Sequence, residues 1–489
     1  MIIRLVAAMV ALCLLLSCSE SDQQSVEGPG VALSPPDAVE QQLQSPAESS
    51  ALSRPNIVFI LVDDMGFGDV GYNGSEIATP NLDEMAQQGM KLDRNYVYPV
   101  CSPTRAALLS GQNPLHMGIT GPIADDASLP EDLKLMPEYF KDLGYRTHMV
   151  GKWHLGLAER SAWPSSKGFD SYYGFLGGWI DFYTHVFAGG HDWQRDGQSI
   201  VEEGHATDLM TDEALSLIKT ESDQPFLIYL AYNAPHSPLQ HPPVYSGLND
   251  YPEVSSRSVY AEMVTHLDMS IGRIFDELED EGVLENTIVV FSSDNGGALN
   301  LGGNNGELRG GKRYAYEGGM RVPGLIRWPG RIQSGATLEQ PISVHDWLPT
   351  LLEATGEDPA AVVDAYGQSM WAAISRGEQV DRHPIVMGAT GNLGVIEWPF
   401  KLVAADDEAG ETNYELFNVV EDPKEQNDLA ELQPDLVKRL VAEIEAMPVP
   451  EFSRLEPEFN NSPRYYSPDK PDWEQRLQAV KEPWAEAAR

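Results

Sequence analysis

The sequence has very little cysteine. Its 489 residues include only three, Cys13, Cys18 and Cys101, and the first two lie in the hydrophobic stretch at the start of the chain. The rest of the chain therefore holds a single cysteine, which excludes an intrachain disulfide and a cysteine-rich zinc site there. By itself, a lone cysteine is most often a small buried hydrophobic residue.

Basic residues are scarce as well. Lys and Arg total 33 against 74 Asp and Glu, so the formal net charge is −41. Nucleic-acid binding requires a basic surface, and we therefore exclude nucleic acid as a partner. The overall field also repels anions, so an anionic substrate would need a local cluster of cations or a bound metal ion. The proportions of hydrophobic residues (42%) and charged residues (22%) are ordinary for a globular enzyme.

The hydrophobic run that opens the chain is too short for an ordinary membrane span. Arg4 precedes an apolar stretch from Val6 to Leu16, which leads into the sequence LLSC ending at Cys18. This pattern is similar to a bacterial lipobox, although a plain secretory signal with an incidental cysteine is the alternative. We expect residues 1–18 to be a lipoprotein-type signal peptide and residues 19–53, rich in Ser, Pro, Gln and Glu, to be a flexible linker. The protein is then exported to the periplasm or cell surface and anchored in a membrane through a lipid on Cys18.

Strands and helices alternate through most of the chain that follows. The predicted strands are Asn56–Val62, Tyr145–Val150, Phe226–Ala231, Thr287–Ser292 and Gly324–Trp328. The predicted helices are Pro80–Met90, Pro103–Leu109, Leu133–Leu143, Ala206–Lys219 and Ser255–Glu281. This alternation predicts an α/β domain over residues 54–375, built on a large, mostly parallel sheet flanked by helices. Weaker strand patterns and a helix at Pro434–Ala446 predict a smaller C-terminal α+β subdomain over residues 376–489, with an extended tail.

Two of the predicted strands end in acidic residues. Asp63 and Asp64 follow the strand Asn56–Val62, and Asp294 and Asn295 follow the strand Thr287–Ser292. In open α/β sheets, ligands bind at the carboxyl ends of the strands. Side-chain oxygens with no histidine or cysteine near them in the sequence suit a hard cation such as Ca²⁺. Each pair by itself is more typical of a turn or a helix cap, but two pairs after two buried strands favour a metal site.

Several motifs in a fixed order carry a family resemblance. They are Cys101-Ser102-Pro103-Thr104-Arg105, the segment 144–156 (GYRTHMVGKWHLG), Ala234-Pro235-His236, Asp294-Asn295-Gly296-Gly297 and Leu308-Arg309-Gly310-Gly311-Lys312. Together they resemble type I, formylglycine-dependent sulfatases over about residues 56–312. Within that family the spacing is most similar to arylsulfatase B, the N-acetylgalactosamine-4-sulfatase, which suggests a 4-sulfated galactosamine unit as substrate. The resemblance implies an alkaline-phosphatase-like fold.

The resemblance assigns the nucleophile to Cys101, which a maturation enzyme oxidises to formylglycine. The aldehyde hydrates to a geminal diol, one hydroxyl of which attacks sulfur while the other later expels sulfate. Pro103 is expected to open a helix just after this residue, so that the positive helix end faces the anion. A mature active protein therefore depends on a formylglycine-generating enzyme as a partner.

The resemblance also assigns the other site residues. Those implied to hold Ca²⁺ are Asp63, Asp64, Asp294, Asn295 and the modified Cys101. Arg105 orients the diol, and Lys152 and Lys312 bind sulfate oxygens as charge moves to the leaving group. His154 supports the diol and acts as base, and His236 with Lys312 protonates the leaving oxygen. The roles of the two histidines could be exchanged.

Three functions are compared. The first is an exported sulfatase, a sulfuric ester hydrolase acting on a sulfated saccharide or an aryl sulfate. The second is a phosphatase or phosphonate-ester hydrolase of the same superfamily, but such enzymes typically bind two metals through several histidines, which the acidic strand ends lack. The third is a non-catalytic, anchored glycan-binding protein, which would have lost Cys101 or a key lysine or histidine. Every one of those residues is present.

Some polar residues lie outside the assigned site. Segments 178–185 and 304–307 fall where the resemblance places loops at the pocket rim, and an ordinary loop explains each equally well. Four histidines lie in no motif and are expected to be structural: His116, His191, His241 and His266.

Overall fold

β1 (Asn56–Val62) lies in the middle of a ten-stranded sheet, as its continuous apolar sequence predicts for a strand buried on both faces. It pairs in parallel with β10 (Phe226–Ala231) on one side and β11 (Thr287–Ser293) on the other. The parallel pairing continues beyond β10, whereas β12 is antiparallel to β11 and β8 to β5, so the sheet is mixed at its sides. The order across the sheet is β13 (Ala336–Leu338), β2 (Met90–Leu92), β12 (Gly324–Arg327), β11, β1, β10, β4 (Arg146–Lys152), β5 (Ser171–Phe175), β8 (Gln194–Arg195) and β9 (Gln198–Ser199).

The computed structural model describes residues 54–447 apart from 124–126, 158, 189, 245 and 252. The predicted signal peptide (1–18), the predicted linker (19–53) and the end of the predicted tail (448–489) lie outside the described residues, and what we expect of them stays a prediction. Among the described helices, none combines the length and the apolar character that crossing a bilayer requires.

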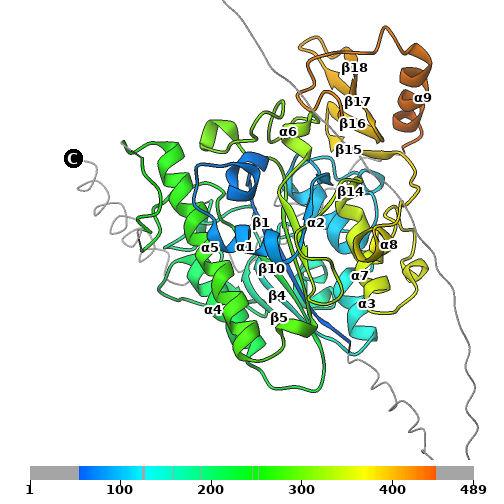
Figure 1. Ribbon diagram of the computed structural model, residues 1–489. Coiled ribbons are helices and arrows are strands. Elements are labelled where there is room, and N and C mark those ends of the chain that lie inside the picture. The colour runs from blue at the N-terminus through cyan, green and yellow to red at the C-terminus, as the bar shows by residue number, and fades with distance from the viewer. Residues whose placement is uncertain are drawn as a thin grey trace, which may run out of the picture. The chain divides into compact units, whose positions relative to one another are not determined.

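Helices cover both faces of the large sheet (Figure 1). The side chains of β1 alternate between two hydrophobic cores, with Ile57, Phe59 and Leu61 in one and Val58, Ile60 and Val62 in the other. The helices that contribute to the first core include α2 (Cys101–Ser110), α3 (Met136–Asp142), α7 (Trp347–Ala354) and α8 (Trp371–Arg376). Those that contribute to the second are α1 (Pro80–Gln88), α4 (Ala206–Ile218) and α5 (Ser256–Asp280). The strand ends that carry the acidic residues are therefore held between two packed layers.

A smaller antiparallel sheet forms the C-terminal part of the described chain (Figure 1). Its strands, in order, are β15 (Ile385–Ala389), β16 (Asn392–Glu397), β17 (Phe400–Asp406) and β18 (Thr412–Asn418), and α9 (Pro434–Glu445) packs beside β16 and β17. Two-stranded pairs, β14 (Ile342–Ser343) with β3 (Asn95–Tyr96) and β6 (Val186–Phe187) with β7 (Gly190–His191), complete the sheets. Lys401 of β17 pairs with Glu317 of α6 (Glu317–Met320) at 3.0 Å, so the small sheet is tied to the first part of the chain. The predicted boundary at residues 375/376 falls in the last turn of α8 and stays a prediction.

The elements differ from the sequence-based prediction mainly at their ends and edges. α2 begins at Cys101 rather than at Pro103, because the extended Val100 precedes the helix and a proline in the first turn gives up no intrahelical hydrogen bond. β5 was not predicted, since Gly174 weakens its strand pattern. A Cβ at Gly174 would lie 2.2 Å from the carbonyl oxygen of Gly151 on β4, so the close strand pairing requires glycine there.

Candidate active site

Two neighbouring strand ends bring the four predicted acidic and amide ligands together. Val62 is paired with Ser293 in the β1–β11 register, so the residues that follow emerge side by side. Asp63, Asp64, Asp294 and Asn295 are all buried. The backbone N–H of Asp64 donates to Asp294 Oδ1 at 3.3 Å, and Asn295 Nδ2 donates to Asp64 Oδ1 at 2.7 Å. Asp64 adopts a left-handed conformation with φ of 67°, which is uncommon for a residue other than glycine.

Cys101 lies in the first turn of α2 and faces this cluster. Its side chain is buried, and its Sγ is 3.2 Å from Nδ1 of His154, the second residue after β4. Burial raises the pKa of the Cys101 thiol, although the charges of Lys152 and Lys312 act in the opposite direction. The unmodified side chain is therefore a protonated thiol at neutral pH, and the thiol is a weak nucleophile compared with the thiolate.

Three cations surround the three carboxylates. Arg105 donates from Nε and Nη2 to Asp294 Oδ2 at 3.1 and 2.8 Å, and from Nη1 to the carbonyl oxygen of Lys152 at 3.0 Å. Lys152, the last residue of β4, donates to Asp63 Oδ2 at 2.5 Å. Lys312 lies 2.6 Å from an oxygen of Asp64. Both lysines thus contact predicted metal ligands, because buried carboxylates at this density need nearby positive charge.

These charges shift the pKa values of the carboxyl groups in opposite directions. Burial raises the pKa of Asp63, but Lys152, His236, Arg105 and Lys312 outweigh that effect and hold it well below its usual range. Burial and the neighbouring Asp63 charge raise the pKa of Asp294, in spite of Arg105. The cluster as a whole is close to neutral, since three carboxylates face three cations.

The two predicted catalytic histidines contact different members of the cluster. His154 contacts Cys101, and burial lowers its pKa well below the usual value. His236 follows β10; its Nδ1 donates to the carbonyl oxygen of Ser237 at 2.6 Å, and its Nε2 lies 3.7 Å from Asp64 Oδ2. No histidine is near the acidic strand ends in the sequence, but in the folded protein His236 lies beside them, so the expectation of a metal site without histidine nearby is wrong. β10 is the neighbour of β1, and the loop after β10 brings His236 to the carboxylates, which spacing along the chain does not reveal.

Two buried oxygen atoms of the cluster have no hydrogen-bond partner among the described residues. They are Asp63 Oδ1 and Asn295 Oδ1, one from each strand end. An unpaired buried oxygen costs free energy unless a donor or a cation satisfies it. Carboxylate and amide oxygens are the ligands that Ca²⁺ prefers. The residues present therefore fit a bound Ca²⁺ ion, and Asp63, Asp64, Asp294 and Asn295 would hold it.

Two residues outside the list of predicted site residues, Asn305 and Tyr260, fix the loops of this site. Asn305 is buried; its Oδ1 accepts the N–H of Gly297 at 2.8 Å and its Nδ2 donates to the carbonyl of Gly310 at 3.0 Å. It thereby joins the loop after β11 to the loop that carries Lys312, and it does not line a rim. Tyr260 of α5 donates to the carbonyl oxygen of Asp64 at 3.1 Å. Asn305 belonged to a noted motif, whereas nothing in the sequence of a long helix distinguishes Tyr260.

The segment around Gly178 packs against His154. A Cβ at Gly178 would be 2.8 Å from ring atoms of His154, so a larger residue there would force the imidazole to move. The neighbouring Trp179 packs edge-on against Phe187, with ring centroids 5.1 Å apart. Segment 178–185 thus contacts His154, and its place at a pocket rim stays a prediction.

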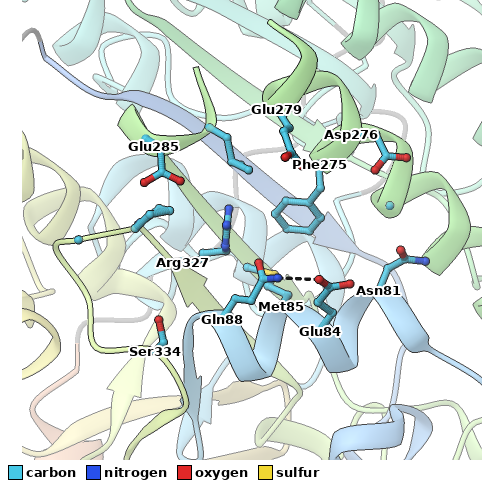
Figure 2. Close-up of a pocket in the computed structure, with 14 residues that line it drawn as sticks. Asn81, Glu84, Met85, Gln88, Phe275, Asp276, Glu279, Glu285, Arg327 and Ser334 are labelled. Carbon is cyan, nitrogen blue, oxygen red and sulfur yellow. Dashed lines mark hydrogen bonds between the residues drawn. The ribbon is translucent and has the colours of Figure 1, made fainter. Parts of the chain in front are cut away.

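A separate cavity of about 400 Å³ lies elsewhere on the molecule. Figure 2 shows it lined by α1, the second half of α5 and Arg327 at the end of β12. Arg327 pairs with Val289 near the start of β11, so this cavity lies at the amino end of that strand, opposite Asp294. It contains none of the predicted site residues.

The ten predicted site residues thus converge at one edge of the sheet, and comparison with known proteins agrees with this architecture. A family model described as Sulfatase matches residues 55–357. The chain belongs to the sulfatase family. A second model, described as N-sulphoglucosamine sulphohydrolase, C-terminal, matches residues 309–448 of this sulfatase. Its predicted activity as a sulfuric ester hydrolase is thereby confirmed at the level of the family.

Individual relatives extend the comparison over most of the sulfatase. Arylsulfatase J of Mus musculus is 32% identical over 482 residues, covering 85% of this chain and 80% of the relative. N-acetylgalactosamine-6-sulfatase of Mus musculus is 36% identical over 360 residues, covering 67% and 68%. The crystal structure of Ps i-CgsB in complex with k-i-k-neocarrahexaose matches with a TM-score of 0.77 at 29% identity, over 86% of this chain and 99% of that one. The predicted alkaline-phosphatase-like fold is confirmed, and the likeness to arylsulfatase B stays a prediction.

Proposed function

We propose that this sulfatase hydrolyses sulfate monoesters of a sulfated carbohydrate outside the cytoplasm, with a formylglycine made from Cys101 and one Ca²⁺ ion. The observation that carries the proposal is the balanced group of three carboxylates and three cations around one buried cysteine. Adding Ca²⁺ to this group would make the site positive, as an anionic sulfate ester requires in a chain whose net charge is −41.

The metal part of the proposal rests on the two unpaired oxygens, Asp63 Oδ1 and Asn295 Oδ1. Bound Ca²⁺ would act as a Lewis acid on the nucleophile and on a sulfate oxygen. Arg105, which bridges Asp294 and the carbonyl oxygen of Lys152, keeps that carboxylate in place. Asn295 contributes an oxygen without a further negative charge, so the site remains attractive to an anion.

The nucleophile part rests on the surroundings of Cys101. A buried, protonated thiol is poorly suited to attack a sulfate ester, whereas hydrated formylglycine would supply one hydroxyl for attack on sulfur and a second for release of sulfate. The first turn of α2 presents backbone N–H groups and the positive helix end to the anion. His154, with Nδ1 at 3.2 Å from Cys101 Sγ, is the base nearest to this position. A formylglycine-generating enzyme would be needed as maturation partner.

The direction of the substrate follows from exposure. The side chain of Lys312 is 16% exposed and that of His236 is 13% exposed, whereas those of Lys152 and Arg105 are fully buried. The organic part of the ester would therefore leave toward solvent past Lys312 and His236. Both lie near Asp64. We infer that they protonate the leaving oxygen, while Lys152 binds the sulfate from inside.

The substrate class is proposed from the relatives. An N-acetylgalactosamine-6-sulfatase and a neighbour bound to k-i-k-neocarrahexaose both favour a sulfated saccharide over a simple aryl sulfate. A 4-sulfated galactosamine unit, suggested by the motif spacing, is one saccharide to test. Export and a lipid anchor at Cys18 are proposed from the sequence of residues 1–18.

Ester hydrolysis with matched substrates tests the proposal. Purified protein from a host that forms formylglycine is incubated with sulfated glycosaminoglycan and algal oligosaccharides, and with the corresponding phosphate and phosphonate esters. We expect release of inorganic sulfate, loss of this release after chelation, and recovery with Ca²⁺. Peptide mass spectrometry should find residue 101 as the aldehyde.

Three results would contradict the proposal. Faster release of phosphate or phosphonate would favour the phosphatase alternative, and binding of saccharides without turnover would favour the glycan-binding alternative. An active protein with an intact Cys101 thiol would exclude the proposed nucleophile.

A further inference from the structure

A second group of metal-ligating side chains lies between α4 and α5, apart from the active site. His205 immediately precedes α4, Asp208 lies in its first turn, and His266 lies in the middle of α5. The two helices pack side by side on one face of the large sheet (Figure 1). One nitrogen or oxygen atom from each of the three residues lies within 4.8 Å of the other two.

The geometry of the group suits a cation. Nε2 of His266 lies 2.9 Å from Asp208 Oδ1, and the rings of His205 and His266 are 5.0 Å apart between centroids. Metal–nitrogen bonds to Zn²⁺ are about 2.0–2.1 Å long, so small side-chain rotations bring all three ligand atoms to one ion. The ion would replace the proton shared by His266 and Asp208, which is released to solvent.

His205 supplies an independent observation. Its side chain is 96% buried, being only 4% exposed, yet neither ring nitrogen has a hydrogen-bond partner among the described residues. A buried imidazole that lacks both partners is costly, and a metal ion on one nitrogen removes part of that cost. Phe182 stacks on the same ring at 5.1 Å, which orients it toward the space shared with His266.

We propose that His205, Asp208 and His266 bind a divalent transition metal ion of the Zn²⁺ class. Two imidazoles and one carboxylate favour such an ion over Ca²⁺, which prefers oxygen ligands alone. The site is therefore distinct in chemistry from the all-oxygen strand ends at Asp63 and Asp294. It joins the start of α4 to the middle of α5.

The contacts around the group give the ion a structural role beside the active site. The N–H of Ala206 donates to the carbonyl oxygen of Phe182 at 2.7 Å, and the ring of Tyr183 packs edge-on against His205. Phe182 and Tyr183 belong to the segment whose Gly178 contacts His154. A metal ion that fixes His205 thus also fixes the segment that contacts His154 through Gly178.

Titration of the purified full-length protein with Co²⁺, a coloured substitute for Zn²⁺, tests this site. Excess Ca²⁺ is present throughout so that the strand-end ligands are occupied. We expect one Co²⁺ per chain with visible absorption typical of nitrogen ligands, displacement of that absorption by Zn²⁺, and a Zn²⁺-dependent rise in the unfolding temperature. Asp208→Asn, at a half-exposed side chain, and His266→Gln should each weaken binding by about 100-fold and abolish the rise.

Two variants serve as controls for the location of the ion. His116→Gln changes an exposed histidine outside the group, and His236→Ala removes the histidine nearest the active-site carboxylates. Both should bind Co²⁺ as the unaltered protein does. The proposal is overturned if the unaltered protein binds no Co²⁺ in excess Ca²⁺, if folded Asp208→Asn and His266→Gln keep their affinity, or if His236→Ala loses it.

Discussion

Two clusters of buried charge in this molecule look alike in composition and differ in what surrounds them. The active-site cluster joins Asp63 and its neighbours to Lys152 at a strand end. The second cluster joins Glu317, Lys401 and Glu425 where the small C-terminal sheet meets the rest of the chain, with Lys401 at 3.0 and 3.1 Å from the two glutamates. In both clusters the central lysine is fully buried.

The differences separate the candidate active site from the second cluster, Glu317, Lys401 and Glu425, which we call the structural joint. The active-site cluster has members that reach solvent, Lys312 and His236, and it contains a potential nucleophile. The joint is closed: Glu317 accepts from the hydroxyl of Tyr96 at 3.1 Å and from Lys401, and no histidine or cysteine takes part in these contacts. Buried charge by itself therefore does not identify an active site. An opening to solvent next to a potential nucleophile favours one.

The largest effect should come from the nucleophile itself. Cys101→Ala is expected to reduce kcat/KM for the sulfate ester by about 10⁵-fold or more, because it removes the reacting group while the fold of α2 is kept. Ser110→Ala, a buried change near the other end of the same helix, should leave kcat/KM close to that of the unaltered protein. Sulfate release measured beside circular dichroism spectra checks both. Equal losses in the two variants would mean that helix packing, and not chemistry, is responsible.

Exchanging the two central lysines for methionine compares the clusters directly. Lys152→Met should lower kcat by about 10³-fold, since Lys152 is expected to stabilise charge on the sulfate. Lys401→Met should lower the free energy of unfolding by about 3–5 kcal/mol, because it removes the cation that Glu425 contacts and leaves Glu317, among the described residues, with only Arg321 at 3.7 Å. The remaining folded protein should nevertheless keep its kcat. Denaturant unfolding and kcat per folded molecule distinguish these results. A large loss of kcat in folded Lys401→Met would remove the distinction between site and joint.

The joint should also respond to pH. Burial, with the neighbouring Glu317 charge, raises the pKa of Glu425 from 4.5 to about 7. The folded state therefore holds this proton more tightly than the unfolded chain, and the stability contributed by the protonated group is lost as pH rises from about 4.5 to 7. Between pH 4.5 and 8, the stability of Glu425→Gln relative to the unaltered protein should improve by about 3 kcal/mol.

Thermal or urea unfolding at a series of pH values measures this difference. Glu431→Gln, at an exposed glutamate outside the joint, is the control and should run parallel to the unaltered protein. Parallel curves for Glu425→Gln as well would show that its carboxyl titrates normally in the folded state.

Much of the fold could be predicted because its central elements carry strong local patterns. The strand Asn56–Val62 was predicted with its observed bounds, and the helix Ser255–Glu281 is one residue shorter at each end. Short strands near the two sides of the sheet, such as β2 and β8, were missed, since two or three residues carry too little periodicity to detect. The start of α2 was placed two residues late because proline was assumed to occupy the first helical position.

The amino-acid sequence alone predicted which ten side chains come together at the carboxyl ends of the central strands of this sulfatase, because each motif combines residue types that few other chemistries need together. It did not determine their neighbours in space. Only in the tertiary structure does His236 lie beside Asp64 and His205 beside His266. Only there does Asn305 hydrogen-bond both the loop after β11 and the loop that carries Lys312. Those contacts arise from strand order and helix packing, which bring together segments far apart in the chain. No local sequence pattern predicts such contacts.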